Sequence, residues 1–290
     1  MTTKLIPASS TPFDFTAEEL RSFGAIHLSQ SDTQPVAGIC SGVLFSPRYV
    51  LTAGHCAAMA KAAHLPATNW VYKVGSRIDA PEESHHVEKM AGLLNVYDTT
   101  HILRIPNDLC ITRLADNVIG STLIPITVEP NIGDELVIVA YGPETEIHVP
   151  SDIDKCIRSK GTARVLDILP GMLILEETRG TELYQGDSGG AVIAGPGNDK
   201  HLVGLISFIS TVESGADFRR ANGLPDGGRI ILAPSLATLL PSIQGLIQTI
   251  ETDTSGETVL IPPEPSELSI LPWIIGGAAV VAFGAWLALR

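Results

Sequence analysis

The chain has 290 residues, a formal net charge of −13 at pH 7 and a hydrophobic content of 44%. A chain of this length accommodates one or two domains, and the hydrophobic share is enough for a sizeable core. The negative charge argues against nucleic acid as a partner, because such a surface would repel its phosphates.

The N-terminal sequence MTTKLIPASSTPFDF lacks the apolar run of a secretory signal, so we expect residues 1–20 to form a polar arm. From Phe23 onward, short runs rich in β-branched residues are separated by Gly, Pro, Asp and Asn, as in GVLFS, YVLTA and GRIILA. Such runs predict an all-β barrel or sandwich, and no βαβ alternation is visible. Between Leu236 and Ile250 apolar residues recur at helical spacing despite Pro241, which predicts a closing helix.

Three motifs, taken in chain order, carry residues that could act together in catalysis. LTAGHC contains His55, NDLCITRL contains Asp108 and GDSGG contains Ser188. A serine hydroxyl is a poor nucleophile at neutral pH; it needs an imidazole to take its proton and a buried carboxylate to orient that imidazole. The three residues lie far apart in the sequence, so only a folded domain could unite them. The motif around Asp108 does not by itself identify the acid, and Asp98 is an alternative.

The GDSGG motif also fits the G-x-S-x-G elbow of α/β-hydrolases. Those enzymes carry their residues in the order serine, acid, histidine. After Ser188 the sequence offers only His201, with Asp199 as the acid between them. These two residues are too close to each other and to the serine to reach it from separate loops, so the elbow interpretation is excluded.

In their order and composition the three motifs resemble those of the chymotrypsin/trypsin-like serine peptidases, and the resemblance covers residues 21–250. It implies two six-stranded antiparallel β-barrels with a C-terminal helix, and hydrolysis of a peptide or protein substrate through an acyl-enzyme, without a metal or organic cofactor. It selects Asp108 as the acid, since the family places that acid immediately before an alternating strand. It also implies that the backbone N–H groups of Gly186 and Ser188 form the oxyanion hole.

The resemblance further implies a disulfide between Cys40 and Cys56, which bracket the segment CSGVLFSPRYVLTAGHC. In the family this pair pins the loop that carries the histidine. A bridge closing a loop of this length contributes about 3 kcal/mol in the chain-entropy model. Cys110 and Cys156 have no family partners, and we expect both to be buried free thiols.

The segment HLVGLISFIS resembles the family strand whose backbone pairs with a peptide substrate, so we expect Ser207, Phe208 and Ile209 to flank the cleft. Glu182 stands where trypsin-like members carry the acidic base of the specificity pocket, which would favour Lys or Arg beside the scissile bond. Gln185 is expected to contact the substrate as well.

The chain departs from the family pattern at three points. Ile209 occupies a place where open-pocket members carry glycine, and Tyr184 stands where one of two bracing cysteines would be. A solvated surface glutamate at Glu182 is therefore the alternative to a pocket floor. Family zymogens are cut to release an amine that pairs with the Asp before the serine, here Asp187, and no Ile-Val-Gly-Gly-type site precedes Cys40. Either another partner holds this carboxylate, or the domain needs help to order its pocket.

The C-terminal part of the chain differs in composition. Residues 251–269 are acidic and contain prolines, which is typical of a solvated linker. Ile270–Leu289 has no charged side chain, and roughly 20 residues at about 1.5 Å each match a hydrocarbon core near 30 Å. Trp273 and Trp286 near its ends favour the membrane interface. We predict a transmembrane helix over 270–289, with a buried globular helix as the alternative.

The sequence features that bear on which side of the membrane carries the catalytic domain conflict with each other. The absence of an apolar signal run and the hydrophobic segment at the chain end are typical of a tail-anchored cytosolic domain. However, no Lys or Arg lies between Arg229 and Arg290, so the positive-inside tendency would keep Arg290 cytoplasmic and the catalytic domain outside. A bridged Cys40–Cys56 pair agrees with that side, which we favour. The stretch 276–290 also loosely resembles a processed bacterial sorting tail.

Residues 81–88, PEESHHVE, gather carboxylates and imidazoles without a recognised ligand spacing, so we expect a solvated loop and not a metal site. We expect Arg219 and Arg220 to be ordinary surface residues. The alternative to an enzyme is a non-catalytic peptide- or protein-binding module on the same scaffold, and a structural membrane adaptor is a third hypothesis. The presence of all three triad residues favours the enzyme.

Overall fold

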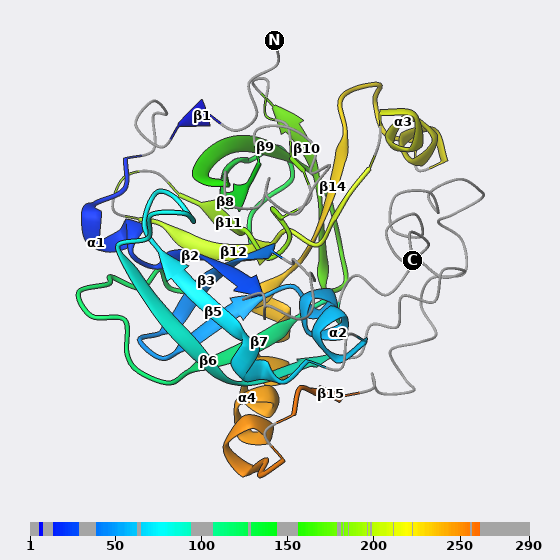
Figure 1. The fold of residues 1–290 in the computed structure, drawn as a ribbon. Helices are drawn as coiled ribbons and strands as arrows, with labels where there is room; N and C mark the ends of the chain where they lie inside the picture. Colours follow the sequence, from blue (N-terminus) through cyan, green and yellow to red (C-terminus); the bar gives the residue numbers. More distant parts are fainter. Residues whose placement is uncertain are drawn as a thin grey trace, which may run out of the picture.

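Antiparallel strands in two sheets form the body of the protein, seen here in a computed structural model (Figure 1). The structure describes residues 6–7, 14–28, 39–62, 65–93, 107–126, 129–143, 156–178, 181, 183–184, 186–195, 197, 199–210, 212–221, 223–255 and 257–261. Asp98, Glu182, Gln185 and the apolar segment Ile270–Leu289 lie outside the described residues.

The first sheet closes into a six-stranded antiparallel barrel, as expected. Its strands are β2 (Phe23–Leu28), β3 (Ile39–Ser46), β4 (Tyr49–Thr52), β5 (Trp70–Val74), β6 (Glu83–Leu93) and β7 (Cys110–Leu114). Closure depends on β6, which pairs with β5 through its first half and with β7 mainly through its second half. In β5, buried Trp70, Tyr72 and Val74 alternate with half-buried residues, because successive side chains of a strand point to opposite faces.

The second sheet is a half-barrel, which corrects the expectation of two six-stranded barrels. Its strands, in spatial order, are β12 (His201–Leu205), β11 (Ala191–Ala194), β8 (Glu135–Gly142), β9 (Ile157–Leu169), β10 (Met172–Thr178), β14 (Ile230–Pro234) and β13 (Phe208–Ile209). The chain from β12 to β13 is interrupted at Ile206 and Ser207, so β12 pairs with β11 whereas β13 pairs with β14. One isolated bridge, between Gly204 and Ser235, joins β12 to the residue that follows β14. The interruption places Ser207 at a break in the sheet.

A common hydrophobic core fixes the two sheets relative to each other. It draws on the barrel, the half-barrel and the C-terminal helix, and its strand residues include Phe23, Val43, Leu51, Ile111, Val137, Val139, Ala191 and Ile193. Each sheet also encloses a core of its own, around Trp70 in the barrel and around Leu175 in the half-barrel. Because a buried side chain of this size contributes about 1.5–3 kcal/mol, a core shared by both sheets resists their displacement.

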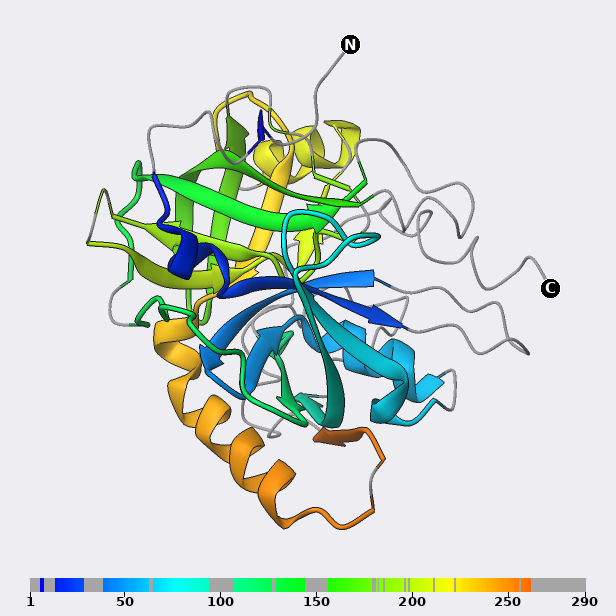
Figure 2. The same cartoon turned by 60° about the vertical axis from the view of Figure 1, so that its left-hand side comes forward.

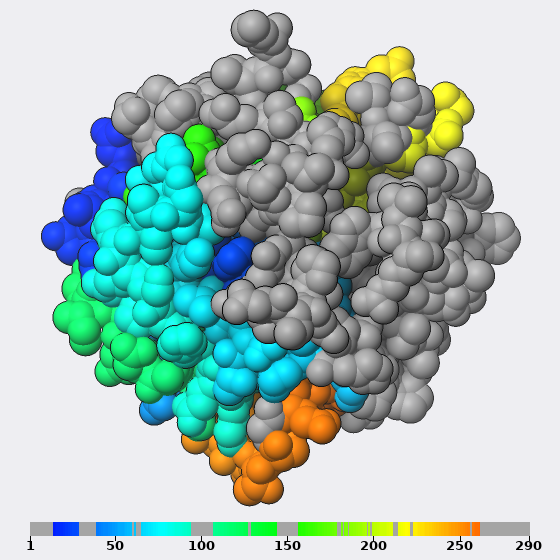
Figure 3. Space-filling model, viewed as in Figure 1, coloured from blue at the N-terminus to red at the C-terminus, as the bar shows by residue number. Residues whose placement is uncertain are grey.

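The remaining elements lie around the sheets. They are β1 (Ile6–Pro7), α1 (Ala17–Leu20), α2 (Gly54–Ala62), the 3₁₀ helix η1 (Ala67–Asn69), α3 (Val212–Ala221), α4 (Leu236–Thr252) and β15 (Val259–Ile261). Within the expected N-terminal arm, β1 pairs with β9. Figures 1 and 3 show α3 and α4 at opposite ends of the molecule.

The predicted closing helix is confirmed as α4. Leu236, Leu239, Ile243, Leu246 and Ile250 are buried on it and recur every three or four residues, so they form one apolar stripe. This stripe packs against β6, β7 and β12, and Figure 2 shows the helix running beside both sheets. The helix therefore reinforces the contact between barrel and half-barrel.

Two expected loops contain strand. Within residues 251–269, expected to be a solvated linker, β15 pairs in parallel with the second half of β6, on the edge that β5 leaves open. Within residues 81–88, also expected to be a loop, Glu83–Glu88 form the beginning of β6. Among the described residues, no helix is long and apolar enough to cross a membrane.

Arg219, expected on the surface, is buried. Its side chain is 1% exposed, and its Nη2 donates to Glu176 Oε1 at 2.7 Å. Helix α3 turns this arginine toward the half-barrel, whereas Arg220 on the same helix remains exposed, as expected.

Candidate active site

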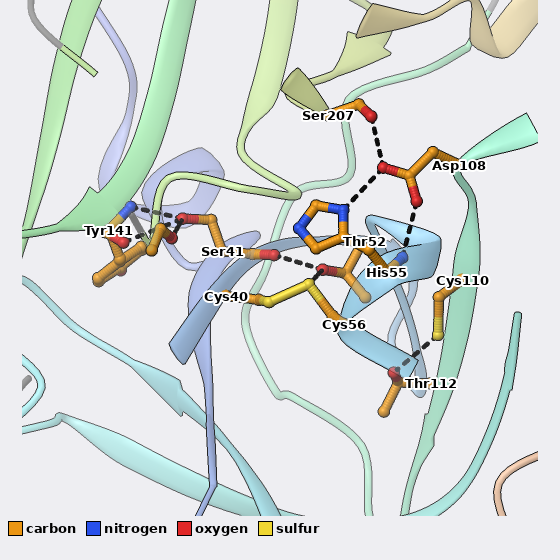
Figure 4. The surroundings of a disulfide bond; sticks show 11 residues. Cys40, Ser41, Thr52, His55, Cys56, Asp108, Cys110, Thr112, Tyr141 and Ser207 are labelled. Atoms are coloured by element: carbon orange, nitrogen blue, oxygen red, sulfur yellow. Dashed lines mark hydrogen bonds and ion pairs between the residues drawn. A yellow bond between two sulfur atoms is a disulfide. The ribbon is translucent and has the colours of Figure 1, made fainter. Parts of the chain in front are cut away.

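His55 and Asp108, from separate motifs, meet in a buried site (Figure 4). The ring Nδ1 of His55 lies 2.8 Å from Asp108 Oδ2, and the backbone N–H of His55 donates to Asp108 Oδ1 at 2.7 Å. His55 is in the first turn of α2, directly after β4, and Asp108 precedes β7; β4 and β7 are paired strands. The strand pairing therefore brings these two side chains together.

The contact with a carboxylate determines the tautomer of the imidazole. Because an ionised carboxylate only accepts hydrogen bonds, the neutral ring carries its proton on Nδ1 and leaves Nε2 as an acceptor. Nε2 is thus the ring atom able to take a proton from a nucleophile.

The surroundings of Asp108 keep its carboxyl ionised. Burial by itself raises the pKa of Asp108, but the charge and hydrogen bonds of His55 and the hydroxyl of Ser207 together hold the pKa below its usual range. Gly54 permits this approach, since a Cβ there would lie 2.9 Å from Leu109 N and 3.0 Å from Asp108 Oδ1.

Ser207 contacts Asp108, a role that the sequence did not predict. We expected it beside the substrate, but its side chain is buried and its hydroxyl donates to Asp108 Oδ2 (Figure 4). The break between β12 and β13 lets this side chain turn away from the sheet ladder. The position of a serine just before an aromatic strand residue carries no sequence signal for such a contact.

Half-buried Ser188 lies on a tight turn that packs against the end of β4. Gly189 has a φ of +80°, and a Cβ on it would lie 2.2 Å from both Ser41 O and Thr52 Oγ1. Only glycine fits this left-handed and crowded position. The turn that carries Ser188 is therefore in contact with Thr52, three residues before His55.

Ser41 on β3 links this turn to both sheets, and no sequence motif indicates this role. Its backbone N–H donates to Ser188 O at 2.7 Å, and its hydroxyl donates to Gly186 O at 2.9 Å. The same hydroxyl accepts from Tyr141 N of β8 at 2.7 Å. Ser41 therefore fixes the turn on either side of Asp187.

The N–H groups of the turn differ in their use. Within the described part of the chain, those of Asp187, Gly189 and Gly190 donate to backbone carbonyls, whereas no hydrogen bond starts from the N–H of Gly186 or Ser188. The two N–H groups named in the sequence analysis are thus the ones in this turn without a hydrogen bond to another described residue.

Asp187 has a partner within its own loop. The side chain is fully buried, and its Oδ2 accepts from Tyr184 N at 2.7 Å while Asp187 N donates to Tyr184 O at 3.1 Å. The Asp187 carboxylate therefore accepts a hydrogen bond from a backbone N–H of its own loop.

Phe208 and Ile209, two of the expected substrate contacts, form β13 and are half-buried. They pair with Leu232 and Ile231 of β14, and β13 is the last strand of the sheet path. An edge strand can accept an extended peptide by β-strand addition. Glu182 and Gln185 lie outside the described residues.

The cysteines follow the expectation. Cys40 and Cys56 form a disulfide beside the ring of His55 (Figure 4), and Cys110 and Cys156 are buried and free. Burial raises the pKa of the Cys110 thiol. Among the described residues, the one group of three potential metal ligands is Cys40, His55 and Cys56, and its two sulfurs are joined to each other.

The fold and motifs together define a chymotrypsin-like domain, and a sequence profile of the family described as Trypsin matches residues 18–220. The chain belongs to the trypsin family of serine peptidases.

Two curated relatives are similar to this chain. The CLIP domain-containing serine protease B15 of Anopheles gambiae is 28% identical over 219 residues, which cover 64% of this chain and 56% of that protein. The Kallikrein 1-related peptidase b27 of Mus musculus is 30% identical over 194 residues, which cover 59% of this chain and 70% of that protein. The matched region is thus little more than half of the first relative.

Two solved structures share the fold. The scabies mite inactivated protease paralogue S-I1 has a TM-score of 0.56 at 16% identity, with 82% of this chain and 100% of that chain covered. The human heparin binding protein has a TM-score of 0.55 at 16% identity, with 81% of this chain and 94% of that chain covered. At this identity the likeness shows the fold alone.

Proposed function

We propose that this protein is a membrane-anchored serine endopeptidase that hydrolyses peptide bonds through an acyl-enzyme. The observation that carries the proposal is the double hydrogen bond between the Asp108 carboxylate and His55, which leaves Nε2 of the ring as a proton acceptor. In this mechanism Ser188 Oγ attacks the substrate carbonyl while His55 Nε2 takes the hydroxyl proton. The imidazolium then protonates the leaving amine, and a water attacks the acyl-enzyme by the same path.

Asp108 orients the ring and stabilises the imidazolium without itself becoming protonated. The low pKa of its carboxyl supports this role, because the group stays anionic throughout the cycle. The Ser207 hydroxyl adds a further hydrogen bond to the same oxygen that faces the ring.

The N–H groups of Gly186 and Ser188 would stabilise the oxyanion of the tetrahedral intermediate. Support comes from the turn itself, where these two N–H groups donate to no other described residue, whereas those of Asp187, Gly189 and Gly190 do. Fixed donors of this kind are effective because they do not reorganise during the reaction; losing one commonly costs about 10²–10³ in turnover.

The substrate would be an extended peptide or protein segment lying along β13. The edge position of Phe208 and Ile209 in the half-barrel supports this mode of binding. We retain Glu182 as a proposed determinant for Lys or Arg beside the scissile bond, together with Gln185, on the sequence pattern alone.

The membrane anchor is proposed from the apolar sequence Ile270–Leu289. We place the catalytic domain on the extracytoplasmic side, since the Cys40–Cys56 bridge is of the kind that forms in oxidising compartments. Protease protection of the full chain in sealed vesicles tests this: cleavage of the domain without detergent supports an external domain in right-side-out vesicles.

Labelling with a fluorophosphonate probe tests the enzyme. We expect the full chain to react at Ser188 and to cleave a peptide library, and we expect Ser188→Ala to lose both activities. Ser255→Ala, which removes an exposed hydroxyl beyond α4, is the matched control and should behave like the unmodified chain. A folded chain that neither labels nor cleaves would contradict the proposal.

A non-catalytic binding module is the second candidate, because the fold is shared with a structure titled as an inactivated protease paralogue. The present chain carries serine, histidine and aspartate together, which favours the enzyme. The other solved structure is a heparin binding protein, but the net charge of −13 disfavours binding of a polyanion by this chain. Peptide binding that is unchanged in Ser188→Ala and never leads to turnover would favour the module.

A further inference from the structure

Two charged side chains converge on one buried residue of the segment that leads into the Ser188 turn. Leu183 N donates to Glu177 Oε1 at 3.0 Å, and Arg229 Nη2 donates to Leu183 O at 2.9 Å. Both backbone groups of Leu183, which is fully buried, are thus satisfied by an acid and a base from outside the loop.

The acid and the base are themselves fixed. Glu177 is the penultimate residue of β10 and Arg229 immediately precedes β14, and Glu177 N donates to Arg229 O at 3.3 Å where these strands meet. Arg229 Nη1 lies 3.7 Å from Glu177 Oε1, and Arg229 Nε donates to Ser210 O at 2.9 Å. The side chain of Glu177 is 7% exposed and that of Arg229 is 21% exposed, so solvent screens their interaction little.

Hydrogen bonds within the loop connect Leu183 to the turn that carries Ser188, the proposed nucleophile. Tyr184 N donates to Asp187 Oδ2, and Asp187 O accepts from Gly190 N at 2.8 Å. The described cysteines provide no cross-link here, because Cys40 pairs with Cys56 and the other two are free. Hydrogen bonds with the charged side chains of Glu177 and Arg229, and not a disulfide, therefore hold Leu183.

We propose that Glu177 and Arg229 are positioning residues that hold Leu183–Ser188 in the geometry required for reaction at Ser188. This inference rests on the proposed function. Within the described part of the chain, the contacts of Glu177 and Arg229 run to Leu183, Ser210 and each other, so we expect them to act through the loop backbone and to leave the pair His55 and Asp108 unchanged.

A neighbouring ion pair provides a matched control. Glu176 is the neighbour of Glu177 on β10, its partner Arg219 lies on α3, and the two side chains are 15% and 1% exposed. Arg219 donates to the carbonyls of Pro225 and Gly228, and among the described residues the side chains that bond to the backbone of Leu183 are Glu177 and Arg229. Replacing this pair therefore removes a buried acid–base contact of the half-barrel without releasing the segment before Ser188.

The experiment compares Glu177→Met and Arg229→Met with Glu176→Met and Arg219→Met in the full-length chain. We expect the first two to lower kcat and the rate of fluorophosphonate labelling by about 10- to 100-fold, since small misplacements of a reacting group have effects of this size. KM and the pH profile of labelling should stay near those of the unmodified chain. The control variants should lose stability and keep a labelling rate within about threefold, when each is measured well below its own Tm.

Conservative variants distinguish loss of the proposed contacts from a general loss of folding. Glu177→Gln keeps an acceptor for Leu183 N, and Arg229→Lys keeps the charge, so both should retain more activity than the Met variants. Equal loss of rate in the Met and Gln variants, or in the control pair, would overturn the inference. An unchanged labelling rate in Glu177→Met would do the same.

Hydrogen–deuterium exchange of the same variants gives a readout that does not need activity. We expect faster exchange over residues 183–190 in Glu177→Met and Arg229→Met, and no change there in the control pair. An unmodified chain that fails to label would contradict the proposed function, and the exchange result would then decide by itself whether these residues order the segment.

Discussion

The carboxylate of Asp108 receives two hydrogen bonds from a single residue, because the backbone N–H and the ring Nδ1 of His55 take one oxygen each. The backbone N–H can only donate, so it determines which oxygen remains for the ring. Both side-chain oxygens of Asp108 are therefore needed as acceptors, and replacing one of them with an N–H donor would change the position of the ring proton of His55.

Asp108→Asn should therefore abolish most of the activity while preserving the fold. The single amide oxygen would accept from the His55 backbone N–H, leaving the NH₂ group toward Nδ1 and forcing the ring proton onto Nε2. We expect kcat to fall by about 10⁴-fold, as in enzymes with the wrong histidine tautomer. Asp79→Asn, at an exposed ion pair with Arg77, is the control. An Asp108→Asn enzyme within about tenfold of the unmodified chain would contradict the triad.

Ser207→Ala should lower both kcat and the free energy of unfolding at neutral pH, because Asp108 is ionised there and loses a hydrogen-bond donor. The hydroxyl donates to the oxygen of Asp108 that faces the ring, and a hydrogen bond to a charged group contributes about 1.5–3 kcal/mol, equivalent to roughly 10- to 100-fold. Steady-state kinetics of Ser207→Ala and Ser207→Thr test this, since threonine keeps the hydroxyl. A Thr variant as slow as the Ala variant would indicate packing and not the hydrogen bond.

The low pKa of Asp108 predicts a specific loss of stability in acid. Its folded pKa lies below the unfolded value of 3.8, so the folded state binds this proton less readily than the unfolded chain. The resulting stabilisation is fully present above that value and is lost as the pH falls through the folded pKa. Urea unfolding of the unmodified chain and Asp108→Asn between about pH 5 and 2 should show a difference in free energy that shrinks with falling pH. A constant difference would refute the assignment.

Gly189→Ala should disrupt the turn that carries Ser188. Its Cβ would lie 2.2 Å from two atoms of β3 and β4, and the backbone is left-handed at φ +80°. We expect a loss of about 3 kcal/mol or more in the free energy of unfolding, together with a loss of labelling at Ser188. Gly197→Ala, also left-handed but with no atom of the described residues within 4 Å of its Cβ, should cost only about 1–2 kcal/mol. Equal losses in the two variants would argue against a close contact at Gly189.

Thiol titration should distinguish the cysteines. The native chain should react slowly with a maleimide, because Cys110 and Cys156 are buried and burial raises the pKa of the Cys110 thiol. Denaturation without reductant should expose two thiols, and prior reduction should expose all four cysteines. Four thiols without reductant would mean that Cys40 and Cys56 are not bridged.

Much of the fold could be read from local sequence because it depends on local patterns. The alternation in Trp70–Val74 predicts a strand, and the apolar spacing over Leu236–Ile250 predicts the helix that is observed as α4. Two loop predictions were wrong for identifiable reasons, because residues 83–88 and 259–261 form strands. The beginning of β6 is rich in charged and polar residues, and β15 is a three-residue strand whose partner is distant in the sequence.

The sequence by itself determined the residue types that carry the chemistry, their order along the chain and the cysteines that could bridge, since these are properties of short motifs. The tertiary structure alone decided that Ser207 donates to Asp108, that Ser41 holds the turn of Ser188 and that Glu177 and Arg229 converge on Leu183. Each of these contacts joins residues on different strands or loops. A hydrogen bond needs its partners within about 3 Å, and for such pairs only the packing of the two sheets sets that distance.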